Sequence, residues 1–244
     1  VLEGMGADAI GVNCSLGPRE MPPLVEELTR WSTLPIAIKP NAGLPDPGGA
    51  GYDITAEEFA AAMADLAPMG VKLFGGCCGT TPEYIALLKR ALMGQAIREP
   101  SRQVPAAVCG PTLAVPIDRV RVIGERINPT GKKLMKEALR RGDVDYILNQ
   151  ALTQVEAGAD ILDVNVGLPE VDEEEMMVRA VKAIQGVCDA PLQLDSTDPK
   201  VLERALRVYC GKAIVNSVNV DRETMEAILP LVKKYGAAVV GLTL

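Results

Sequence analysis

Short apolar runs alternate along the chain with longer amphipathic segments. The runs predict strands at residues 8–13, 35–39, 71–74, 120–124, 161–164, 191–194, 213–215 and 237–242. The amphipathic segments predict helices at residues 22–31, 55–68, 82–92, 132–141, 143–157, 172–185, 199–209 and 222–235. Strands that alternate with helices of this length are typical of βα units in a parallel α/β fold.

The alternation stops between residues 94 and 119. Four prolines are spaced through this stretch, and it has neither a helical nor a strand period. We interpret it as an interdomain linker, since a surface loop of this length within one domain is uncommon. The predicted organisation is a first part at residues 1–93, a linker at 94–119 and a second part at 120–244.

Eight predicted strands would suit one (β/α)8 barrel. The linker, however, follows only the third strand, and the sequence opens at Val1 without an initiator methionine. We therefore expect a segment of something longer rather than one closed barrel.

Composition excludes several classes of function. A formal net charge of −7 and 3% aromatic residues argue against nucleic-acid binding, because there is neither a basic face nor a stacking platform. No apolar run has the length of a membrane span. Six scattered cysteines do not make a disulfide scaffold, which favours a reducing compartment and predicts a cytoplasmic protein. The chain has no histidine, so metal binding must use thiolates, carboxylates or amides.

The adjacent cysteines Cys77 and Cys78 lie among glycines after a predicted strand. Neighbouring cysteines seldom form a disulfide, because its geometry is hard to reach between them, so a metal is the first candidate ligand. Cys14, which also follows a predicted strand, is the candidate third ligand. Three protein ligands with an open fourth position are typical of catalytic zinc. The alternative is a buried Cys14 beside a pair of free thiols.

Polar side chains follow the predicted strands, where βα folds place their active sites. These residues are Cys14, Asn41, Cys77, Cys78, Glu125, Asn128, Asp163, Asn165, Asp195, Asn216 and Asn219. Asp and Asn also favour helix N-caps, and for Asp163, Asn165 and Asn219 that role is an equal alternative.

The second half offers acids and amides but no phosphate-binding loop and no paired glycines for a dinucleotide. Such side chains can form hydrogen bonds with the donors and acceptors on the edge of a neutral heterocycle. A pterin has such an edge, and from chemistry alone a purine or a sugar fits almost as well.

Two sets of motifs resemble known families. The first half resembles the zinc-dependent homocysteine methyltransferase domain, through Asn13-Cys14 and Gly75-Gly76-Cys77-Cys78-Gly79-Thr80-Thr81-Pro82. The second half resembles the pterin-binding domain of methyltetrahydrofolate-using corrinoid methyltransferases, through Glu125-Arg126-Ile127-Asn128-Pro129-Thr130-Gly131, Leu194-Asp195-Ser196 and Asn216-Ser217-Val218-Asn219. This resemblance implies parts of two (β/α)8 TIM barrels joined by the linker, each incomplete. Residues 1–93 would be the C-terminal part of the homocysteine and zinc barrel, and residues 120–244 the N-terminal part of the pterin barrel.

The resemblance also implies roles for individual residues. Cys14, Cys77 and Cys78 would bind zinc, homocysteine would add its sulfur at the open position, and Asn41 would be the metal ligand when substrate is absent. The residues that would hold the pterin are Glu125, Asn128, Asp195 and Asn216, with Asp163 and Asn165 as further candidates.

The function implied is methyl transfer from methyltetrahydrofolate to homocysteine through cobalamin, which a domain absent from this chain would bind. Because both barrels are incomplete, we expect the chain alone to be inactive. Two alternatives remain: a corrinoid-independent homocysteine S-methyltransferase, which leaves the second half unexplained, and a non-catalytic thiol or metal-binding protein.

Overall fold

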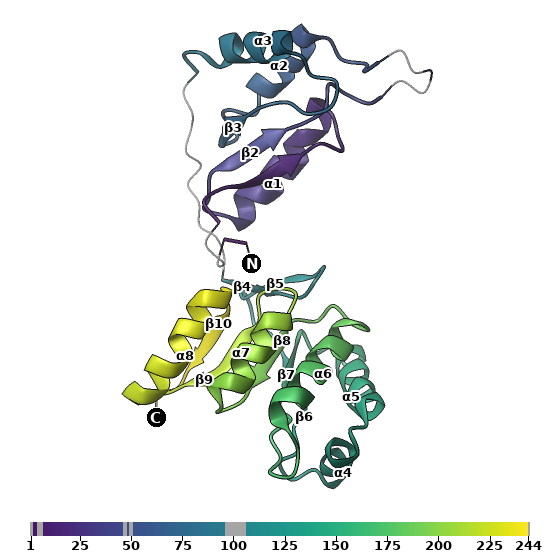
Figure 1. Cartoon of the computed structure of the whole chain (residues 1–244), viewed down its shortest axis with the longest axis vertical. Helices are drawn as coiled ribbons and strands as arrows, with labels where there is room; N and C mark the ends of the chain where they lie inside the picture. The colour runs from purple at the N-terminus through teal and green to yellow at the C-terminus, as the bar shows by residue number, and fades with distance from the viewer. Residues whose placement is uncertain (1, 4–6, 46–47, 49–50, 96–105, 244) are drawn as a thin grey trace. The chain divides into compact units, whose positions relative to one another are not determined.

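The computed structural model describes residues 2–3, 7–45, 48, 51–95 and 106–243. Its secondary structure falls into two compact units (Figure 1). The first holds the elements from β1 to α3, and the second holds those from β4 to β10.

The first unit is a three-stranded parallel sheet with its helices. The strands are β1 (Ile10–Asn13), β2 (Ile36–Lys39) and β3 (Val71–Phe74), in the order β1-β2-β3. The helices are η1 (Pro18–Glu20), α1 (Met21–Trp31), α2 (Ala56–Ala64) and α3 (Pro82–Leu92). Strand residues Ile36 and Ile38 are fully buried with the helical residues Met21, Phe59 and Met63, and this contact fixes the helices on the sheet.

Local signals in the sequence set the ends of two of these helices. Thr55 caps α2, because its hydroxyl accepts from Glu58 N–H while the Glu58 carboxylate accepts from Thr55 N–H. Pro82 occupies the first turn of α3, where its missing N–H costs no hydrogen bond. Both starts agree with the prediction.

The second unit is a five-stranded parallel sheet in the order β10-β9-β8-β7-β6. Its strands are β6 (Ile123–Ile127), β7 (Ile161–Val164), β8 (Leu192–Asp195), β9 (Ile214–Val218) and β10 (Ala238–Gly241). Its helices are α4 (Lys133–Arg141), α5 (Val144–Glu156), α6 (Glu173–Gln185), α7 (Pro199–Val208) and α8 (Arg222–Tyr235). The alternation of parallel strands and helices confirms the predicted α/β class.

Side chains on the two faces of this sheet differ in character. Leu162, Leu192, Leu194 and Val215 pack with the helices in the main core. On the other face, Ile161 and Ile214 lie near the strand starts in a small apolar cluster, and Asp163 and Gln193 are buried further along. This polar face can therefore present side chains to a ligand at the carboxyl ends of the strands.

The prediction of a linker at residues 94–119 is wrong for the second part of this range. Residues Ala107–Cys109 (β4) and Ala114–Pro116 (β5) form an antiparallel hairpin within the second unit. Val108 and Val115 bury their side chains against Ile161 and Ile214, and Cys109 pairs with Lys212. Each strand has only three residues, too few for a visible hydrophobic period. Residues 96–105 lie outside the described residues.

Strand β6 starts three residues later than predicted. The apolar residues Val120 and Val122, which suggested the earlier start, are 90% and 54% exposed. The strand instead runs through Glu125 and Arg126 to the fully buried Ile127. The apolar residues alone placed the predicted strand too early, because the polar pair Glu125 and Arg126 belongs to the strand.

None of the helices in the described part of the chain is both long and apolar enough to span a bilayer.

Candidate functional site

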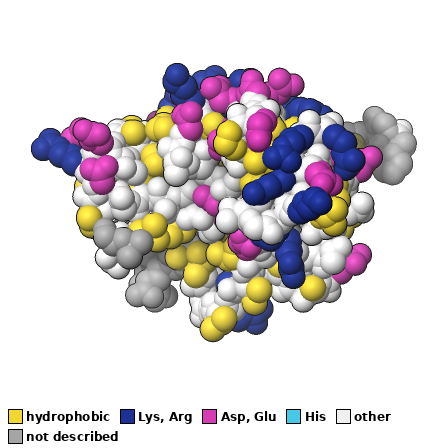
Figure 2. Space-filling view, turned by 90° about the horizontal axis from the view of Figure 1, so that it is seen from below, with side chains coloured by type: hydrophobic (Ala, Val, Ile, Leu, Met, Phe, Trp, Pro, Cys, Tyr) yellow, Lys and Arg dark blue, Asp and Glu magenta, His cyan; other side chains and the backbone are white. Residues whose placement is uncertain are grey.

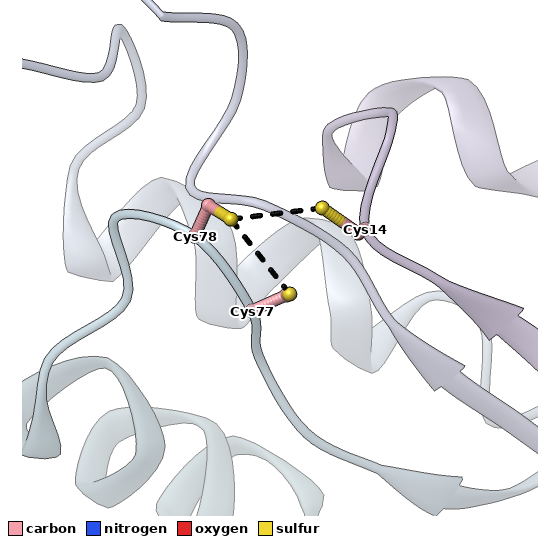
Figure 3. Close-up of side chains that lie close together, drawn as sticks. All are labelled: Cys14, Cys77 and Cys78. Carbon is pink, nitrogen blue, oxygen red and sulfur yellow. Dashed lines mark hydrogen bonds between the residues drawn. The ribbon is translucent and has the colours of Figure 1, made fainter.

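Three cysteine thiols from two distant loops converge in the first unit (Figure 3). The Cys14 and Cys78 sulfurs are 3.6 Å apart, and those of Cys77 and Cys78 are 3.9 Å apart. All three sulfurs lie within 4.8 Å of one another. Cys78 is exposed and the other two are half-buried, so a ligand can reach the cluster from solvent.

Backbone hydrogen bonds between neighbouring strand ends hold the two loops together. Cys14 N–H donates to the carbonyl of Lys39 at 3.0 Å, and Cys77 N–H donates to that of Pro40 at 2.8 Å. Ala42 N–H donates in turn to the Cys78 carbonyl at 2.9 Å. The segment after β2 thus lies between the two cysteine loops and fixes their separation.

The turn that presents Cys14 has an uncommon backbone conformation. Cys14 and Ser15 both have φ of 65°, in the left-handed region that side chains other than Gly, Asn and Asp rarely adopt. Leu16 N–H closes the turn by donating to the Cys14 carbonyl at 2.8 Å. Strain at a surface turn is typical of positions where a side chain must point in one particular direction.

The thiols of Cys14 and Cys78 differ in acidity. Hydrogen bonding from Ser15 N–H lowers the pKa of Cys14, and the Cys78 and Cys77 thiols lower it further. The pKa of Cys78 is raised, chiefly because its thiol is hydrogen-bonded to Cys14 and then to Cys77. Cys14 therefore ionises more readily than Cys78.

The spacing of the sulfurs fits a tetrahedral thiolate site. Zinc–sulfur bonds of about 2.3 Å to tetrahedral corners place neighbouring sulfurs roughly 3.8 Å apart. The two measured separations, 3.6 and 3.9 Å, bracket this value. In such a site the three sulfurs would fill three corners and leave the fourth for a ligand from outside.

Asn41 lies directly beside the sulfurs. It is 7% exposed, and its Oδ1 accepts from Cys78 N–H at 3.2 Å. Its side chain also contributes a hydrogen bond that lowers the pKa of Cys14. In this structure its amide therefore orients two of the cysteines.

Tyr52 is a neighbour of the cluster that the sequence analysis missed. Its ring lies over Gly79, where a Cβ would be only 2.2 Å from a ring carbon. Burial raises the pKa of its hydroxyl, and the charge of Cys78 and a hydrogen bond to Cys78 add to the shift. Nothing in the glycine- and proline-rich stretch around Tyr52 signalled this contact, because it depends on how the loop folds back.

A second polar cluster lies on the sheet of the second unit. Asp163, on β7, is 2% exposed, and its Oδ1 accepts from Gln193 Nε2 at 2.5 Å and from Asn216 Nδ2 at 3.4 Å. Burial raises the Asp163 pKa to about 6, and the negative charges of Asp195 and Glu125 contribute to the rise. Within the described part of the chain, the buried Gln193 Oε1 lacks a hydrogen-bond partner. Gln193 was not predicted as a site residue, because the other residues of the predicted strand 191–194 are apolar.

Asp195 and Asn165 form the outer part of this cluster. Asn165 Nδ2 donates to Asp195 Oδ2 at 2.9 Å, and Asn165 Oδ1 accepts from Gly167 N–H at 2.9 Å. One carboxylate oxygen of Asp195 is thereby oriented by the neighbouring strand. Asp163, Asn165, Asp195 and Asn216 are thus linked to one another directly or through their charges.

The remaining predicted residues occupy different positions. The Glu125 carboxylate is 56% exposed and pairs with Lys132 Nζ at 2.9 Å. Asn128 Oδ1 accepts from Thr130 N–H, and Asn219 Oδ1 accepts from Asp221 N–H, so both amides stabilise turns. The helix N-cap role considered for Asn219 is not observed, because Asp221 is the N-cap residue of α8.

Two family models match the chain. Residues 1–92 match homocysteine S-methyltransferase, and residues 124–244 match pterin binding enzyme. The first match thus covers the unit that holds the cysteine cluster, and the second covers most of the unit that holds the polar cluster.

Over its whole length the chain is related to methionine synthase. It is 36% identical to methionine synthase of Mycobacterium tuberculosis (strain ATCC 25618 / H37Rv) and 35% identical to that of Mycobacterium leprae (strain TN). Both alignments cover 100% of this chain but only 21% and 22% of the relatives. The chain therefore spans about a fifth of the length of these relatives. The resemblance to homocysteine methyltransferase and pterin-binding domains, which the cysteine and pterin motifs predicted, is confirmed.

Solved structures of dihydropteroate synthases match the chain in part. The enzyme (FolP) from Thermus thermophilus is 26% identical with a TM-score of 0.39, over 55% of this chain and 47% of that one. The enzyme from Vibrio fischeri ES114 is 21% identical with a TM-score of 0.42, over 57% and 50%.

Proposed function

We propose that the chain supplies two sites for methyl transfer from 5-methyltetrahydrofolate to homocysteine through cobalamin, which yields methionine and tetrahydrofolate. The observation that carries this proposal is the convergence of the Cys14, Cys77 and Cys78 sulfurs, which lie within 4.8 Å of one another. The relationship to methionine synthase supports it, because both family matches lie in one chain.

In the first unit, Cys14, Cys77 and Cys78 would hold zinc, and the thiol of homocysteine would take the fourth position. A bound zinc ion would keep a coordinated thiol deprotonated at neutral pH, which suits a chain without histidine. Asn41 would orient Cys78 and Cys14 through its hydrogen bonds, and its role as a ligand in the absence of substrate is also part of the proposal.

In the second unit, the linked acids and amides would hold the pterin ring. Asp195 has a carboxylate already oriented by Asn165, and it would accept from N–H groups of the ring. Asp163 and Asn216 would contact the ring deeper in the sheet, while Glu125 and Asn128 would lie at the rim.

The two sheets would be sectors of two (β/α)8 barrels. Each is a parallel sheet in sequential strand order with open edges among the described residues. The cobalamin-binding domain would be a separate partner, and we expect the 244 residues alone to form no methionine, because neither sheet closes around its site.

Zinc content tests the first site. We expect about one zinc per chain in the wild type. Cys14→Ser and Cys77→Ser should each lower zinc affinity about a hundredfold or more, because a lost ligand costs more than a lost supporting hydrogen bond. Cys210→Ser, which changes an exposed cysteine outside the cluster, is the matched control and should retain full zinc. Full zinc affinity in Cys14→Ser would instead indicate metal buffering by the vicinal pair.

Folate binding tests the second site. Asp195→Ala should weaken 5-methyltetrahydrofolate binding about tenfold to a hundredfold, because a charged hydrogen-bond acceptor is lost. Asp198→Ala, which removes only the cap of α7, is the control for local structure. Undiminished folate binding by Asp195→Ala would contradict the pterin assignment. Only the proposed zinc site would then remain.

A further inference from the structure

A series of contacts joins the carboxyl ends of β7 and β8 beside the polar cluster. Ser196 follows Asp195 directly and is only 4% exposed. Its hydroxyl donates to Glu173 Oε1 at 2.6 Å and accepts from Asp198 N–H at 3.1 Å. Ser196 is therefore held from two sides, by the first residue of α6 and by the N-cap residue of α7.

The same glutamate lies against the loop that follows β7. A Cβ added to Gly167 would be 3.5 Å from Glu173 Oε2 and 3.3 Å from Asn165 Oδ1. Gly167 N–H donates to Asn165 Oδ1, and Asn165 Nδ2 donates to Asp195 Oδ2, both at 2.9 Å. The contacts therefore form a closed ring, which we call the contact ring and which consists of Asp195, Ser196, Glu173, Gly167 and Asn165.

The contact ring leaves one oxygen of the Asp195 carboxylate available. In the part of the chain that the structure describes, Asp195 Oδ2 accepts from Asn165, whereas Oδ1 has no hydrogen-bond partner. The backbone of Asn165 is itself anchored, because its N–H donates to the Ile127 carbonyl at 2.8 Å. The Asp195 side chain is thus restrained at its carboxylate by Asn165 and at its backbone by the held Ser196, which limits the directions that Oδ1 can take.

Charge alone does not single out Glu173. Figure 2 shows the end of the second unit where its strands finish, with acidic side chains among basic and apolar ones. The neighbouring Glu174 is also an acid of the first turn of α6, and it pairs with Arg204 on α7 at 3.3 Å. Both acids therefore join α6 to the following segment, but of the two only Glu173 bonds to the residue beside Asp195.

We propose that Glu173 is a positioning residue for the pterin ring, which holds the available oxygen of Asp195 toward the ring through the contact ring. The inference rests on the proposed function and deepens it. A hydrogen bond to a carboxylate is about twice as strong as one between neutral groups, so Glu173 restrains Ser196 firmly. A ring N–H then meets an acceptor that is already in place, and binding orders fewer groups.

The test measures the affinity for 5-methyltetrahydrofolate by calorimetric titration of the 244-residue chain and its variants. Glu173→Ala and Ser196→Ala should each weaken binding about 3- to 10-fold, because each removes the same hydrogen bond. The double variant should bind no more weakly than the weaker single variant. Glu173→Gln keeps an oxygen that can accept from Ser196, and its affinity should stay within about twofold of the wild type.

Coupling to Asp195 separates positioning from a general structural role. In the Asp195→Ala background there is no carboxylate to position, so adding Glu173→Ala should cause no further loss of folate affinity. The same loss in both backgrounds would show that Glu173 acts on the fold and not through Asp195, and it would overturn the inference.

Glu174→Ala is the matched control. It removes the same charge one residue further along α6 and breaks the pair with Arg204, and its folate affinity should stay within about twofold of the wild type. Urea unfolding shows which variants are folded. If Glu173→Ala is not, Ser196→Ala decides the test, because it removes the same hydrogen bond by deleting a single oxygen atom.

The possible failures are distinguishable. Wild-type folate affinity in folded Glu173→Ala or Ser196→Ala, or an equal loss in Glu174→Ala, would overturn this inference and leave the proposed function intact. If the wild type binds no folate, or if Asp195→Ala binds it as tightly as the wild type does, the proposed pterin function fails and this inference fails with it.

Discussion

The two candidate sites are built in opposite ways. The cysteine site of the first unit is carried by turns, with two residues at positive φ and sulfurs open to solvent. The polar site of the second unit is carried largely by strand side chains that are buried and bonded to one another, such as Asp163 with Gln193. Backbone hydrogen bonds between loops hold the first site, and hydrogen bonds between buried side chains hold the second.

This contrast predicts how each site responds to change. A metal site depends on each of its few ligands, and its geometry depends on the turns that aim them. A hydrogen-bond network instead changes its protonation and its geometry gradually. The remaining groups of the network partly replace a hydrogen bond that is lost.

Titration of Asp163 should dominate the pH dependence of the second unit. Its pKa is raised from 3.8 to about 6, so the folded state binds the proton more tightly than the unfolded state does. The stabilisation is therefore fully present below about pH 4 and is lost as pH rises through about 6, by about 3 kcal/mol. Urea unfolding of the wild type and Asp163→Asn from acid to neutral pH should show this loss only in the wild type.

Asp160→Asn provides a control of opposite sign for that measurement. The pKa of Asp160 is lowered, first by hydrogen bonding from Val122 N–H and also by Arg121, so its contribution is lost as pH falls. If the stability of Asp163→Asn keeps the wild-type pH dependence, the buried acid is not the titrating group.

Gly79→Ala should disturb the cysteine loop through the backbone and through Tyr52. Its φ of 79° costs a side chain about 1–2 kcal/mol, and a Cβ would also collide with the Tyr52 ring. Gly94→Ala is the matched control, because Gly94 has φ of 81° but no atom within 4 Å of the added Cβ. Chemical unfolding and zinc titration of both should show the larger stability loss, and the only loss of zinc affinity, in Gly79→Ala. Equal effects would mean that the Tyr52 contact is unimportant.

Tyr52→Phe should have the smallest effect. Removing the hydroxyl deletes the hydrogen bond to Cys78 but leaves the ring on Gly79, so zinc affinity should fall about tenfold with little change in unfolding free energy. Tyr84→Phe deletes another tyrosine hydroxyl, bonded to the Ile54 carbonyl at 2.6 Å, and should reduce stability without changing zinc affinity. Competition with a chromogenic chelator measures the affinity of both variants. A loss of zinc affinity in Tyr84→Phe but not in Tyr52→Phe would show that the Tyr52 hydroxyl does not support the cysteine site.

Much of the fold could be predicted from periodicity. Strands β3 and β7 and helices α3 and α8 begin and end where the pattern of apolar residues placed them. The hairpin of β4 and β5 could not, because its burial depends on two valines that meet Ile161 and Ile214 far along the chain.

The sites divide in the same way. Cys14, Cys77 and Cys78 could be proposed because cysteine beside glycine at strand ends is a strong chemical signal, and the structure brings their sulfurs together. Tyr52 and Gln193 gave no such signal, since their contacts arise only when a loop or a neighbouring strand folds against them. The sequence therefore predicted the three thiols that converge and missed two residues beside the sites, Tyr52 and Gln193.

The central claim is that the three thiolates bind zinc with one position left for a thiol from outside. X-ray absorption at the zinc edge tests it directly, on the zinc-loaded chain with and without homocysteine. We expect three sulfurs at about 2.3 Å and one lighter ligand without homocysteine, and four sulfurs with it. A shell of fewer than three sulfurs, or one that homocysteine leaves unchanged, would contradict the account.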